Sequence, residues 1–120
     1  MRIFKNTWFN RFARKEGITD SELREIVNLL EEGLADADLG GNVYKVRVGR
    51  RGEGKSGAYR FIVFFRSEDM TFYQYAFSKS ARSNIDQGEL QFYKKIARTK
   101  LAMSDVELSN AVNAGELIEI

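Results

Sequence analysis

The sequence contains no cysteine and no histidine among its 120 residues. The first absence excludes disulfide bonds and thiolate chemistry, and the second removes the commonest general base. Together they remove the side chains that build the usual zinc sites. We therefore expect a protein without a bound metal or cofactor, whose chemistry depends on other polar groups.

Proline is also absent, and no apolar run approaches the roughly 20 residues that a membrane-spanning helix needs. The first residues, MRIFKNTWFNRFARK, alternate apolar and charged positions, unlike a signal peptide. A chain of this length fits one domain, and no composition shift marks a linker. The sequence predicts a single domain over residues 1–120, located in the cytosol and with no membrane partner.

Positive charge is unevenly distributed along the chain. Residues 43–82 hold nine basic and three acidic side chains, a net charge of +6, whereas the remainder carries −4. Such a basic middle favours a polyanion-binding face. The alternative is that these lysines and arginines only keep a sheet edge soluble.

Periodicity and helix-start signals predict a mixed α+β fold with an antiparallel sheet. A short strand at 2–4 is followed by a helix ending near Gly17 and by an amphipathic helix capped by Thr19 and Glu22. Stretches 43–49, 57–66 and 70–78, rich in β-branched and aromatic residues, predict a three-stranded meander. Two further helices begin near Asp86 and Ser104; residues 35–42 form a loop, and 117–120 form a short strand or an ordered tail.

Positions 49–56, GRRGEGKS, match the phosphate-binding pattern G-x-x-x-x-G-K-[ST]. That motif requires a helix directly after the loop, so that its N-terminal N–H groups meet the phosphate. Here the following residues, 58–65, have a strand composition. The glycines therefore predict a β-hairpin with Lys55 at its tip, and we expect no nucleotide cofactor.

Alternation along the hairpin strands predicts a shared basic face. Lys45 and Arg47 have the same parity, and Arg60 joins them if the two strands align. Lys55, Lys79 and Arg82 are expected at its rim. Tyr73 and Tyr75 would present rings on which unpaired RNA bases stack, unless they simply pack in the core.

Several stretches, taken in their order along the chain, resemble the RelE/HigB toxins of bacterial toxin–antitoxin systems. The most specific are GKSGAYR at 54–60 and FSKSARSNI at 77–85. Weaker similarities lie at residues 40–47, 102–105 and 115–119. The resemblance covers nearly the whole chain and implies a RelE-like fold in the bacterial cytoplasm.

The resemblance implies a metal-independent endoribonuclease that cleaves mRNA on the ribosome and so inhibits translation. Its catalytic residues fall on the positions Lys45, Arg47, Arg60, Lys79 and Arg82. RNA-binding residues are expected at Arg50, Arg51, Lys55, Tyr73 and Tyr75. Because nearby cations favour the neutral amine of a lysine, a lysine can replace histidine as base, and arginines can hold the charge of the reacting phosphate.

The resemblance is incomplete at two positions. Ser80 and Asp86 stand near where the RelE type has an arginine and a tyrosine, which leaves the proton donor to the leaving group open among Lys79, Arg82 and Tyr75. The expected partners are the ribosome, mRNA and an antitoxin with a helix-turn-helix DNA-binding domain. The alternatives are a ParE-like inhibitor of DNA gyrase and a module that only binds single-stranded nucleic acid.

Overall fold

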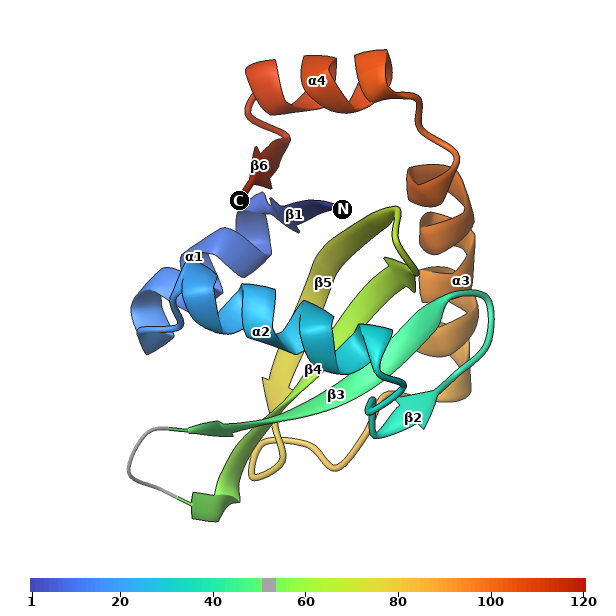
Figure 1. Ribbon diagram of the computed structural model, residues 1–120. Helices are drawn as coiled ribbons and strands as arrows, with labels where there is room; N and C mark the ends of the chain where they lie inside the picture. The colour runs from blue at the N-terminus through green and yellow to red at the C-terminus, as the bar shows by residue number, and fades with distance from the viewer. Residues whose placement is uncertain (51–53) are drawn as a thin grey trace.

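The sheet has six strands in the order β2-β3-β4-β5-β1-β6 within the residues described by our computed structural model, 1–50 and 54–120. The side chains of residues 50 and 54–57 also lie outside this description. The strands are β1 (Arg2–Asn6), β2 (Ala37–Asp38), β3 (Val43–Arg50), β4 (Gly54–Arg66), β5 (Met70–Ser78) and β6 (Leu117–Glu119). β1 pairs with β5 in parallel, and every other pairing is antiparallel (Figure 1).

Helices α1 (Thr7–Glu16) and α2 (Asp20–Glu31) cover one face of the sheet. The Asn6 and Thr19 side chains cap them by accepting hydrogen bonds from backbone N–H groups of the first turn. Gly17 ends α1 with a φ of 70°, a conformation that suits glycine because it has no Cβ. The predicted boundary between these two helices is confirmed.

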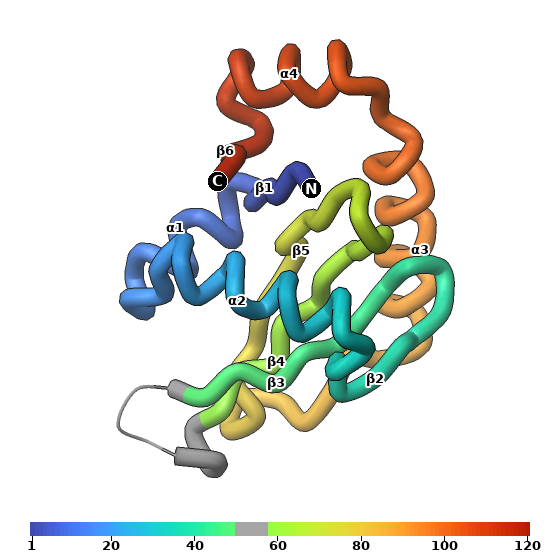
Figure 2. Tube along the Cα trace, in the orientation of Figure 1, coloured from blue at the N-terminus to red at the C-terminus, as the bar shows by residue number. Residues whose placement is uncertain are grey.

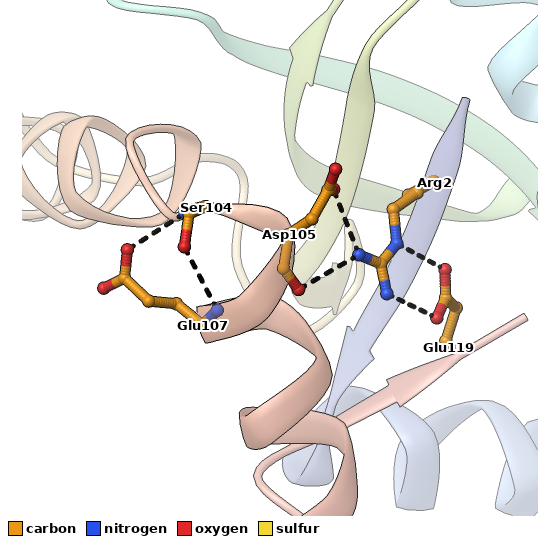
Figure 3. A network of polar contacts seen from close by, with 5 residues as sticks. All are labelled: Arg2, Ser104, Asp105, Glu107 and Glu119. Atoms are coloured by element: carbon orange, nitrogen blue, oxygen red, sulfur yellow. Dashed lines mark hydrogen bonds and ion pairs between the residues drawn. The ribbon is translucent and has the colours of Figure 1, made fainter.

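Helix α3 (Gln87–Leu101) packs on the opposite face, and α4 (Asp105–Asn113) follows it. Both begin with a full capping box, Asp86 with Glu89 and Ser104 with Glu107. Figure 3 shows the second box, in which side chain and backbone exchange two hydrogen bonds.

Alternate residues of the central strands enter two separate cores. Val46, Phe61 and Val63 pack beneath α1 and α2, whereas Val43 and Phe64 pack beneath α3. The central strands are therefore covered on both faces, and the predicted mixed α+β fold is confirmed.

The two ends of the chain lie side by side in the sheet (Figure 2). Arg2 of β1 binds Glu119 of β6 through Nε at 2.8 Å and Nη2 at 2.9 Å, and its Nη1 reaches the Asp105 carboxylate at 3.2 Å (Figure 3). The bond from Arg2 holds the pKa of Glu119 below its ordinary value.

The structure adds two features that sequence patterns missed. Residues 37–38, expected in a loop, form the short edge strand β2 against Tyr44 and Lys45. The pairing of β4 with β5 slips between Ile62 and Val63, which leaves Gln74 as an extra residue in β5. The segment at 117–120, left open between a strand and a tail, contains strand β6.

Candidate functional site

The register of β3 and β4 brings the three predicted cations together. Arg47 lies directly opposite Arg60, and Lys45 lies opposite Ile62, the next position of the same row on β4. All three share the sheet face on which Val43 and Phe64 meet α3. Arg47 is exposed, and Lys45 and Arg60 are half-buried. We call Lys45, Arg47 and Arg60 the basic face.

Arg47 and Arg60 occupy directly opposed positions on neighbouring strands. Cβ atoms of directly opposed residues are about 4.5–5.5 Å apart, and like charges there are destabilising. Each guanidinium group presents N–H donors in a planar fork that suits phosphate oxygens. The arrangement therefore suits a phosphate group better than an apolar ligand.

The same row continues onto β5 through Phe77, which lies opposite Arg60. The guanidinium carbon of Arg82 stands 5.3 Å from the centre of the Phe77 ring. Phe77 was not among the predicted site residues. Its signal was its position within FSKSARSNI, one strand away from Arg60 and five residues before Arg82.

Arg82 is held in place by two acceptors. Its Nη1 and Nη2 donate to the two carboxylate oxygens of Glu89, the first at 3.1 Å, and Nε and Nη2 donate to the Asn84 carbonyl at 3.1 and 3.0 Å. Hydrogen bonding with Glu89 raises the pKa of Arg82 and, in return, lowers the pKa of Glu89. Arg82 is thus a fixed, permanently charged group at the border of the basic face, while Lys79 lies exposed in the preceding turn.

The two tyrosines expected to stack on RNA lie on different faces of the sheet. Tyr73 has no exposed surface, and its hydroxyl donates to the Leu23 carbonyl. Burial raises the pKa of Tyr73. Its ring packs in the α1–α2 core, so the expectation that Tyr73 presents itself to RNA is wrong in this structure, and the packing alternative holds.

Tyr75, beyond the bulge, is half-buried at the border of the other core. Its ring lies 4.8 Å from that of Trp8 and 6.3 Å from that of Tyr93. It also lines a pocket of about 360 Å³, together with Phe12, Phe77 and Arg82. Tyr75 therefore lines a pocket instead of filling the core, and its contact with RNA stays a prediction.

The remaining RNA-binding predictions fall at the hairpin turn. Arg51 lies outside the described residues, as do the side chains of Arg50 and Lys55. The backbone after the turn belongs to β4 from Gly54 onward, so a strand and not a helix follows GRRGEGKS, as predicted. Lys55 is therefore not at the start of a helix, where a P-loop lysine stands.

Within the described ranges, no three carboxylate side chains gather in a way that would hold a metal ion. Across the same residues, no helix combines the length and apolar character needed to cross a membrane. The side chains that the structure places at this site are lysine, arginine and aromatic residues.

A comparison with known protein families gives a match over the full length of the sequence. The family model described as the RelE toxin of the RelE/RelB toxin–antitoxin system matches residues 1–120, the whole chain. No curated protein matches the sequence. The order of elements, the basic face and this match agree, and the chain belongs to the RelE family of toxins of toxin–antitoxin systems.

Proposed function

We propose that this toxin is an endoribonuclease that cleaves mRNA on the ribosome, with the basic face as its active site. The observation that carries the proposal is the register that sets Arg47 opposite Arg60 with Lys45 beside them. A toxin that acts only by binding a protein has no need of two opposed guanidinium groups, whereas a transferring phosphoryl group does.

The proposed reaction uses RNA as its own nucleophile. Lys45 accepts the proton of a ribose 2′-hydroxyl, and the 2′-oxygen attacks the adjacent phosphorus. Arg47 and Arg60 stabilise the charge that builds on the phosphate oxygens. The bond from phosphorus to the 5′-oxygen breaks, which leaves a 2′,3′-cyclic phosphate on one product and a 5′-hydroxyl on the other once that oxygen has taken a proton.

Three residues were candidates for the donor of that last proton. Arginine does not lose its proton in proteins, and the contact with Glu89 raises the pKa of Arg82 further. These observations favour Arg82 as a fixed positive charge that faces the phosphate, and they leave Lys79 and Tyr75 as candidate proton donors.

Arg50, Arg51 and Lys55 at the hairpin turn would contact the RNA backbone, which carries no sequence information.

Single-turnover cleavage of mRNA in a programmed ribosome complex tests the site. We expect Arg60→Ala to slow cleavage by roughly 10²-fold or more, the usual cost of losing one charge-stabilising donor. Lys45→Ala should also slow cleavage while ribosome binding persists. Arg24→Ala, an exposed charge on α2 outside the site, is the matched control. Because Lys45 and Arg60 are half-buried, melting curves of the same variants identify any loss of cleavage that comes from unfolding.

Cleavage at the wild-type rate by both site variants would show that the basic face is not the active site. An intact mRNA accompanied by inhibited DNA gyrase would favour the ParE-like alternative. Family membership implies an antitoxin partner, and we propose that a helix-turn-helix protein encoded beside this chain fills that role. Expression of the toxin alone should stop growth, and co-expression of that neighbour should restore growth and yield a complex.

A further inference from the structure

Helix α1 carries a second surface of aromatic and basic side chains. Trp8, Arg11, Phe12 and Lys15 follow one another at i, i+3, i+4 and i+7, the spacing of a single helix stripe. They line a shallow pocket of about 370 Å³. We call these four residues the α1 stripe.

The α1 stripe is not the part of the helix that holds the fold together. The fully buried residues of α1 are Phe9 and Ala13, which point into the core. Trp8 keeps 41% of its surface exposed, and Arg11 and Lys15 are exposed. A tryptophan exposed to this extent, on the same helix stripe as two exposed cations, is typical of a surface that binds a partner.

A continuous series of rings joins the α1 stripe to the basic face. The Phe12 and Trp8 rings stack at 5.4 Å with 6° between their planes, and Trp8 lies 4.8 Å from Tyr75. Tyr75 lies 6.2 Å from Phe77, and Phe77 is the residue opposite Arg60. The two β5 residues in this series, Tyr75 and Phe77, follow Tyr73, which is the last residue of β5 that pairs with β1.

We propose that the α1 stripe binds single-stranded RNA that continues from the basic face, with bases stacked on Trp8 and Phe12 and phosphates held by Arg11 and Lys15. The inference rests on the proposed nuclease function and extends its substrate site. Alternating rings and cations suit single strands, because every base has a face to stack and every nucleotide has a phosphate to pair. The only acid in α1 is Glu16, whereas Arg14 adds a further positive charge, so the helix as a whole attracts a polyanion.

The chain offers a direct probe, because Trp8 is its only tryptophan. We would titrate the intact protein with a 12-nucleotide single strand whose 2′-hydroxyls are methylated, so that it binds without being cleaved. Trp8 emission should be quenched to saturation. In Arg11→Gln/Lys15→Gln the affinity should fall about tenfold, and the slope of log K against log salt should drop by about 1.4, the effect of two lost single-strand phosphate contacts.

The matched control removes two exposed charges elsewhere, Arg24→Gln/Lys95→Gln, and should keep the wild-type affinity. Trp8→Ala should weaken binding of a fluorescein-labelled strand about tenfold or more, the effect of one lost stacking contact, and Trp8→Phe should restore most of it. Melting curves identify any variant that weakens binding by unfolding.

Wild-type affinity in both Trp8→Ala and Arg11→Gln/Lys15→Gln would overturn the inference, even if the wild-type protein cleaves mRNA. The inference would also be overturned if Trp8 emission did not change with RNA but did change when the neighbouring antitoxin was added. That result would identify the α1 stripe as a protein interface. If RNA quenches Trp8 emission but the protein cleaves no mRNA, the α1 stripe binds RNA as proposed and only the proposed nuclease function fails.

Discussion

One row of side chains on β3 and β4 changes character halfway along the sheet. In the covered half, Val43, Ile62 and Phe64 have no exposed surface and pack in the core that α3 closes. In the open half, the next residues of the same row are Lys45 and Arg60. Figure 1 shows the reason: the hairpin end of β3 and β4 extends away from α3.

The two halves share their strands, their face and their parity, so only the covering helix distinguishes them. Burying a large apolar side chain contributes about 1.5–3 kcal/mol, whereas burying an unpaired charge costs several kcal/mol. Positions of the row that α3 covers therefore hold apolar residues, and positions that α3 does not cover hold cations. The step from Ile62 to Arg60 marks where the core ends and the candidate site begins.

Exchanging the residue types of Ile62 and Arg60 should have the largest effect on stability. Ile62→Lys places an ammonium group where the side chain has 0% exposure and should destabilise the fold by about 4 kcal/mol or more, measured by urea unfolding. Arg60→Leu, its mirror in the open half, replaces a half-buried side chain and should change the free energy of unfolding far less, while cleavage is lost. Equal destabilisation by the two variants would contradict the division of the face.

Lys100 is a cation of α3 that packs against the same core as the covered half, and it sharpens the comparison. Its Nζ donates to Gln74 Oε1 at 2.9 Å and lies 5.7 Å from the Phe72 ring centre. Burial lowers the pKa of Lys100 from 10.5 to about 8. Between pH 8 and 10.5 the unfolded chain holds more protons, so the free energy of unfolding rises with pH through this window.

Replacing Lys100 with methionine should therefore stabilise the protein at pH 7, by up to about 3 kcal/mol. Gln74 would keep a hydrogen bond from Asn6 at 3.4 Å. Urea unfolding of both proteins at several pH values measures the effect, and the advantage of the variant should shrink as the pH approaches 10.5. An advantage that is constant with pH would mean that packing, not charge, is responsible.

The smallest expected effect lies at the border between the halves, where Glu89 holds Arg82. Glu89→Gln should lower the melting temperature by a few degrees at pH 7, since a neutral amide cannot pair with the guanidinium charge. Hydrogen bonding from Arg82 lowers the pKa of Glu89 below 4.5, so the wild-type advantage is present above that value. It should vanish as the pH falls through the lower folded-state value. A difference that persists in acid would assign the loss to the α3 cap instead.

Local signals in the sequence predicted much of this architecture. Capping residues such as Asp86 and Ser104 mark helix starts through bonds made within four residues. Alternation predicted that Lys45 and Arg47 share a face, which Arg60 joins if the two strands align, and the observed register meets that condition. Strand β1 was predicted, but its parallel partner β5 lies far along the chain, where no local pattern identifies it.

The bulge in β5 explains the prediction that failed. Strict alternation puts Tyr73 and Tyr75 on one face, yet the extra residue Gln74 turns them to opposite faces. The Tyr73 ring therefore packs in the core, whereas the Tyr75 ring lines the pocket. The short strand β2 was missed because two residues are too few for any periodic signal.

The pairing of β1 with β6 bears on the order in which the molecule assembles. Arg2 and Glu119, which it brings into contact, are 117 residues apart, and the entropy lost in closing a loop grows with its length. The hairpin of β3 and β4 closes a short loop, and β5 joins it through a three-residue turn.

We infer that the basic face is complete before the two ends of the chain meet. Pulse-labelled hydrogen exchange during refolding should therefore protect the amides of Phe61 and Phe72 earlier than the amide of Ile118. Simultaneous protection would contradict this order. A nascent chain that has released residues 43–78 from the ribosome would then already display its basic face, before its last strand has been translated.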